Sequence, residues 1–148
     1  MKRLTFHNSI TILASAAEVY AYLINPMHLP DLHPLIIGVN PLPSERPGSK
    51  RVEIQDKIML FGRLPFYKKY EASFTPVEEN RKLILETFTS PGIHITNTIV
   101  LEELGNETLV EERVSIEVSA LLAKFVMKQI EFSHVEMLHA LKKKLELA

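Results

Sequence analysis

The last part of the chain, from Ala120 to Leu147, contains neither proline nor glycine and is dominated by alanine, leucine, lysine and glutamate. Apolar residues recur in it at spacings of three, four or seven residues or their sums, which is the pattern of a long amphipathic helix: Leu122, Phe125, Val126, Phe132, Met137 and Ala140. A helix with such an apolar stripe must bury it against another element. The preceding part of the chain therefore has to supply a large apolar surface.

Most of that preceding part alternates between apolar and polar residues, as strands with one buried face do. A first strand is predicted over residues 5–13, and Ser15 and Glu18 then have the spacing of a capping box that starts a short helix. Pro26 ends this helix, and residues 27–32 add one more turn. Further strands are predicted over residues 35–40, 50–58, 64–75, 83–89, 93–101 and 109–118.

Short turns separate these strands, among them Glu79-Asn80, Ser90-Pro91-Gly92 and Gly105-Asn106. Strands joined by such short turns pair in antiparallel fashion. The length of 148 residues suits one domain over residues 1–148. The predicted fold is therefore α+β, with two short helices after the first strand and a curved antiparallel sheet of about seven strands around the long C-terminal helix.

The composition narrows the classes of partner. There is no cysteine, and 17 basic residues nearly balance 18 acidic ones, with a formal net charge of -1. This balance gives no electrostatic reason to expect nucleic acid or an anionic membrane as a partner. No apolar run reaches the roughly 20 residues of a membrane span, and residues 1–7 lack the apolar core of a signal peptide. We expect a cytoplasmic protein without stable membrane insertion and without a cofactor.

Several segments resemble one protein superfamily. Residues 12–20 read I-L-A-S-A-A-E-V-Y and residues 25–34 read N-P-M-H-L-P-D-L-H-P. Together with residues 109–114 and the closing helix over residues 121–145, they resemble the START-like or Bet v 1-like helix-grip superfamily, in particular its polyketide cyclase and ligand-binding branch, SRPBCC. Ser15 departs from that pattern, in which proline is usual. The resemblance implies an apolar cavity between the sheet and the long helix.

Polar residues interrupt the apolar stripe of the long helix. Gln129, Ser133 and Glu136 lie three or four residues apart within it, and each would cost about 1–3 kcal/mol if left unpaired in a solid core. Either they face a cavity, or Ser133 and Glu136 lie at the edge of the stripe near solvent. On the first interpretation, the ligand-binding residues are Phe66, Tyr70, Ile99, Val114, Phe125, Gln129, Phe132 and Ser133.

Ionisable residues in the apolar phase of strands are candidates for acid–base chemistry, because an apolar cavity favours the protonated form of a carboxylate. Glu112 is in phase with Val110 and Val114, and Asp56 with Ile54. The alternative for both is a structural ion pair. The candidate catalytic residues are Glu112, Asp56, Glu136 and His33.

The six histidines do not predict a metal site. His134 and His139 are five residues apart, which does not place them on one helical face. His28 and His33 flank Asp31 without a known metal-binding pattern. Ser133, His134 and Glu136 do not form a hydrolase triad, because adjacent helical residues point in different directions.

Two functions from different classes remain open. The first is a carrier or sensor that holds a hydrophobic small molecule, such as a lipid, a polyketide or an isoprenoid-like compound, which needs a cavity with few polar anchors. The second is an enzyme of the polyketide cyclase or dehydratase kind, which needs a positioned acid or base. A weaker third alternative is an accessory protein that meets a partner through its exposed sheet or helix.

Overall fold

The strands of the protein form one antiparallel sheet in the order β1-β7-β6-β5-β4-β3-β2. The computed structural model describes residues 1–60 and 62–147. The strands are β1 (Lys2–Ile12), β2 (Ile36–Leu42), β3 (Lys50–Leu60), β4 (Leu64–Glu78), β5 (Lys82–Thr89), β6 (Ile93–Leu104) and β7 (Glu107–Val118). The helices are α1 (Ala16–Leu23), the 3-10 turn η1 (Pro26–His28), α2 (Leu29–Leu32) and α3 (Ala123–Glu146). The predicted fold class and element order are confirmed.

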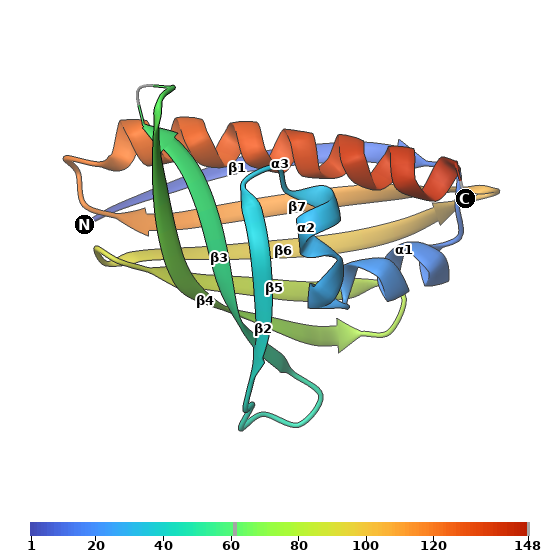
Figure 1. Cartoon of the computed structure of the whole chain (residues 1–148). Helices are drawn as coiled ribbons and strands as arrows, with labels where there is room; N and C mark the ends of the chain where they lie inside the picture. Colours follow the sequence, from blue (N-terminus) through green and yellow to red (C-terminus); the bar gives the residue numbers. More distant parts are fainter. Residues whose placement is uncertain (61, 148) are drawn as a thin grey trace.

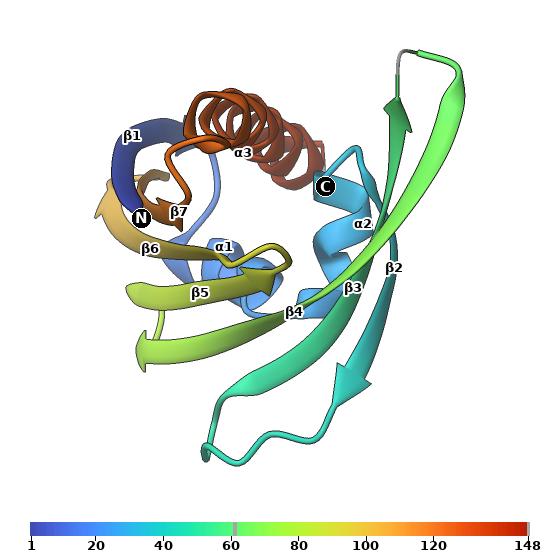
Figure 2. The ribbon, with the colours of Figure 1, turned by 90° about the vertical axis from the view of Figure 1, so that its left-hand side faces the viewer.

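The sheet is strongly bent around α3. In Figure 1 the strands β5, β6 and β7 run nearly along α3, whereas β2 and β3 run across them. Register shifts at Ile36/Gly38 in β2 and at Pro76/Glu78 in β4 interrupt the pairing of these two strands with their neighbours. Such bulges increase the local twist and let a strand bend. The helices α1 and α2 lie near the C-terminal half of α3 (Figures 1 and 2).

The link between β1 and α1 follows the predicted helix start. Ser15 Oγ accepts a hydrogen bond from the backbone N–H of Glu18 at 3.2 Å and contacts the Glu18 carboxylate at 3.2 Å. Asn25 Oδ1 accepts from the Met27 N–H and so caps η1. Capping groups of this kind satisfy backbone donors that lack a partner inside the helix. These caps fix the residues at which α1 and η1 begin, and so the position of His33, which follows α2.

The helix α3 buries one side against the sheet and α2. It packs on β1 and β7, and its buried residues are Ala123, Ser133, Met137, Leu138 and Leu141. Phe125 and Phe132 were expected in the buried apolar stripe but are exposed, with exposed fractions of 62% and 61%. At about 100° per residue, the stripe through Val126, Ser133 and Met137 faces inward and turns both phenylalanines away from the core.

Among the described residues, no helix is both long enough and apolar enough to cross a membrane.

The rotation of α3 predicts unequal costs for two truncations on the same helix. Leu141 is fully buried, so Leu141→Ala should lower the free energy of unfolding by about 2–5 kcal/mol. Phe132→Ala removes a larger but exposed side chain and should cost less than about 1 kcal/mol. Urea denaturation followed by circular dichroism measures both values. Similar losses for the two variants would contradict the observed rotation of α3.

Candidate functional site

A cavity of about 370 Å³ lies between α3 and the strands β3 to β6. Its wall is mostly apolar and includes Leu29, Ile36, Ile54, Phe74, Leu85, Ile95 and Met137. The cavity exists because α3 packs on β1 and β7, while β2, β3 and β4 bend away from the helix (Figure 2). One helix thus covers only part of the concave face of the sheet.

Five of the eight predicted ligand-binding residues line this cavity: Phe66, Tyr70, Phe125, Gln129 and Ser133. Ile99 and Val114 have no exposed surface and belong to solid core clusters instead. They lie on β6 and β7, where the core is filled by direct packing. Phe132 is largely exposed and does not line the cavity. The structure therefore brings the named residues of β4 and three of those of α3 to one cavity, and places Ile99, Val114 and Phe132 elsewhere.

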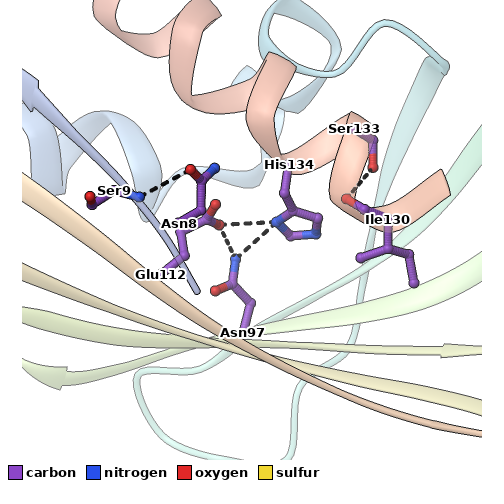
Figure 3. Close-up of polar contacts among 7 residues, drawn as sticks. All are labelled: Asn8, Ser9, Asn97, Glu112, Ile130, Ser133 and His134. Carbon is purple, nitrogen blue, oxygen red and sulfur yellow. Dashed lines mark hydrogen bonds and ion pairs between the residues drawn. The ribbon is translucent and has the colours of Figure 1, made fainter. Parts of the chain in front are cut away.

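A polar cluster joins α3 to the sheet at the cavity wall (Figure 3). Glu112 of β7 accepts a hydrogen bond from Asn97 Nδ2 at 2.5 Å, and its Oε2 lies 3.0 Å from His134 Nδ1. Glu112 is only 1% exposed. Asn97 and His134 line the cavity. A buried carboxylate is stable only when it is paired and hydrogen-bonded, and these two side chains supply the partners.

The arrangement orients the imidazole of His134. Because Nδ1 faces Glu112, Nε2 lies on the far side of the ring, where it makes no hydrogen bond to any described residue. The ring of Phe6 meets the imidazole edge to face, with the centroids 5.8 Å apart. Within the described part of the chain, Glu112 Oε1 and Asn97 Oδ1 are buried without a partner. The cluster therefore contains one ring nitrogen and two buried acceptor oxygens that have no hydrogen-bond partner among the described residues.

A second polar group lies on the strands β3 and β4. The hydroxyl of Tyr70 donates to Asp56 Oδ1 at 3.1 Å. Burial raises the pKa of Asp56, and the Tyr70 hydrogen bond and the nearby Lys68 oppose this shift. Burial and the neighbouring Asp56 raise the pKa of Tyr70. Lys68 also lines the cavity, and its Nζ donates to the Ser90 carbonyl at 2.6 Å.

His33 reaches the cavity from the end of α2. Burial, and secondarily the nearby His134, lower its pKa to about 4. Its Nδ1 is buried without a hydrogen-bond partner among the residues that the structure describes. His33 is therefore neutral at pH 7 and presents an unused polar atom.

The structure brings three of the four candidate acid–base residues to this region. Asp56 and His33 line the cavity, and Glu112 lies directly behind Asn97 and His134. Glu136 is exposed and does not line the cavity, because the rotation of α3 turns it outward. Of the two alternatives for Glu136, the structure agrees with a position at the edge of the stripe near solvent. In the described residues, no group of three or more histidine or acidic side chains converges as a metal site would require.

Sequence reasoning missed His134 and Asn97. Asn97 shares the apolar phase of β6 with Ile93, Ile95 and Ile99, and a polar residue in such a phase was an available signal. His134 was considered only with its neighbours on α3. Its partner lies 22 residues earlier, on a strand, and that pairing depends on how α3 docks.

The comparisons with known proteins concern the fold. No family model matches the sequence, and neither does any curated protein. The ZhuI aromatase/cyclase from Streptomyces sp. R1128 superposes with a TM-score of 0.82 at 14% identity over 98% of this chain and 94% of that chain. A START superfamily protein from Mycobacterium smegmatis gives 0.72 at 16% identity, covering 97% of each chain. Norcoclaurine synthase from Thalictrum flavum gives 0.71 at 18% identity over 96% of this chain and 86% of that chain.

The chain has the START-like helix-grip fold. This agreement confirms the fold that the sequence resemblance implied, and ligand-binding proteins and cyclases share it. At identities this low, the likeness shows the architecture alone. In other helix-grip proteins the same architecture supports different chemistries.

The shifted pKa of His33 predicts a pH-dependent stability. The folded state holds His33 near pKa 4 and the unfolded state near 6.5, so the unfolded state binds more protons between these values and stability falls as pH is lowered. The contribution lost is up to about 3 kcal/mol. His33→Gln should therefore flatten the pH dependence of the urea midpoint between pH 6.5 and pH 4 relative to the unmodified protein. An unchanged slope would show that His33 is freely protonated in the folded state.

Proposed function

We propose that the protein binds an elongated hydrophobic small molecule with one oxygen-bearing polar end and acts in the cytoplasm as its carrier or sensor. The observation that carries this proposal is the cavity between α3 and the strands β3 to β6. Its volume of about 370 Å³ falls in the range of sites for small ligands. A mostly apolar wall favours a ligand of the lipid, polyketide or isoprenoid-like kind.

The polar groups of the cavity support a ligand with one polar end. The ring nitrogen Nδ1 of His33 has no hydrogen-bond partner in the part of the chain that the structure describes, and the Tyr70–Asp56 pair lies on the facing strands. Apolar binding sites typically use a small number of such groups to fix ligand orientation. An oxygen of the ligand would satisfy His33 and release the cost of leaving its buried nitrogen unpaired.

The alternative function is an enzyme of the polyketide cyclase or dehydratase type. The His134–Glu112 pair favours it, since a carboxylate that orients an imidazole leaves the other ring nitrogen free to accept a proton from a substrate. His134 would be the base and Glu112 its positioning residue. An enzyme would change the bound molecule at a rate that Glu112→Gln lowers, whereas a carrier would return it unchanged.

The proposed binding predicts a saturable interaction with 1-anilinonaphthalene-8-sulfonate. Ser133 is a small residue on the cavity wall, so Ser133→Trp should fill the space and abolish most of the probe fluorescence. Glu136→Trp, three residues further along α3 on an exposed position, is the matched control and should retain binding.

Thermal melting of each variant separates blocked binding from unfolding. If Ser133→Trp does not fold, Ala72→Leu fills the same cavity from β4 and takes its place. Bound ligand should also raise the melting temperature, because it binds only the folded state. Failure of the folded, unmodified protein to bind the probe would contradict the proposed function.

A further inference from the structure

The helix α3 and the residues just before it carry a second apolar stripe that faces solvent. It consists of Leu121, Phe125, Phe132 and Val135, spaced by four, seven and three residues. All four are exposed, and the exposed fraction of Leu121 reaches 93%. A single exposed apolar residue is normal, whereas a continuous exposed patch usually marks a surface that contacts something else.

The hairpin of β3 and β4 continues this apolar surface on the other side of the cavity. Leu64 and Phe66, which share one face of β4, are exposed near its start. Phe66 from the hairpin and Phe125 from α3 both line the cavity. The start of β4 and the start of α3 lie at the same end of the molecule in Figure 1, and Figure 2, which looks onto that end, shows β4 standing apart from α3 across the concave side of the sheet. We call this surface, formed by residues 62–69 and by the exposed face of residues 121–135, the rim.

The charges around the rim are segregated. Residues 57–70 contain Lys57, Arg63, Lys68 and Lys69, and residues 118–130 contain Lys124 and Lys128. These two segments contain no aspartate or glutamate, and the rim as a whole carries five basic residues against one acidic residue, the exposed Glu131, although the whole chain has a net charge of -1. Among the described residues, Arg63, Lys124 and Lys128 form no ion pair. The net charge of the whole chain, which is near zero, therefore conceals a local excess of positive charge around the rim.

We propose that the rim docks on the surface of an anionic lipid bilayer and so places the cavity opening against the source of its hydrophobic ligand. This inference rests on the proposed function. Exposed aromatic and leucine side chains enter the region between headgroups and acyl chains, and adjacent lysines attract anionic headgroups. Each such basic residue near the surface contributes about 1 kcal/mol, or roughly a fivefold change in binding.

The same observations disfavour two other occupants of the rim. A second copy of the chain in a two-fold arrangement would bring like-charged rims together, which is unfavourable. A nucleic acid would use the positive charges but would leave the apolar stripe of α3 exposed. The experiment that tests the proposal can also detect each of these two occupants.

The test is sedimentation of the full chain with vesicles of phosphatidylcholine alone or with about one-third phosphatidylglycerol. We expect binding only to the anionic vesicles, and its loss when sodium chloride is raised from about 0.05 M to about 0.5 M. Lys124→Glu/Lys128→Glu should weaken binding by at least about 25-fold. Phe125→Ser/Phe132→Ser should weaken it about tenfold or more, since two apolar anchors are lost.

Lys143→Glu is the matched control, because Lys143 is an exposed lysine at the other end of the same helix. It should change binding less than about fivefold. An equal loss with Lys143→Glu, or no binding to anionic vesicles, would overturn the proposal. So would binding to duplex DNA that Lys124→Glu/Lys128→Glu abolishes while vesicle binding is absent, or a stable dimer in size-exclusion chromatography that Phe125→Ser/Phe132→Ser dissociates.

A vesicle-free titration with 1-anilinonaphthalene-8-sulfonate separates this inference from the proposed function. Probe binding by the unmodified protein without vesicle binding would refute docking alone. Absence of probe binding would refute the proposed function whatever the vesicles show.

Discussion

The packing of α3 on β1 and β7 determines the rest of this structure. Leu138 and Leu141 are fully buried in the core cluster that also contains Ile12 and Val110, and they hold the C-terminal half of the helix. The strands β2, β3 and β4, at the other side of the sheet, bend away from this contact (Figure 2). A sheet of seven strands is wider than one helix can cover, so the space against β3 to β6 stays open and becomes the cavity.

The unfilled cavity lowers the stability of the folded state. Interiors are usually packed as densely as organic crystals. Buried polar atoms that have no partner among the described residues, such as those of His33 and Glu112, oppose folding. Proteins commonly keep such local instability where function needs it. A bound molecule that fills the apolar space and satisfies one of these atoms would remove part of the cost. The same cavity wall therefore lowers the stability of the empty protein and contributes to its affinity for a ligand.

The sequence predicted the strands and their inward faces well, because a period of two leaves little choice of face. Phe66, Tyr70 and Asp56, which it named as candidate site residues, line the cavity. Helix rotation was harder to predict, since α3 carries two apolar stripes and the exposed one contains Phe132. The His134–Glu112 contact depends on tertiary docking and has no local signal. Net charge was also a poor guide, because it averages over the positive segments around the rim.

Nuclear Overhauser effects between a bound ligand and individual methyl groups test the central claim most directly. Ile54 and Ile95 line the cavity, whereas Ile99 is fully buried in the solid core. With methyl-labelled isoleucines and dodecanoate as the ligand, the account predicts effects from the dodecanoate chain to Ile54 and Ile95 and none to Ile99. Effects to Ile99 of the same strength, or none to any of the three in the presence of saturating dodecanoate, would contradict it.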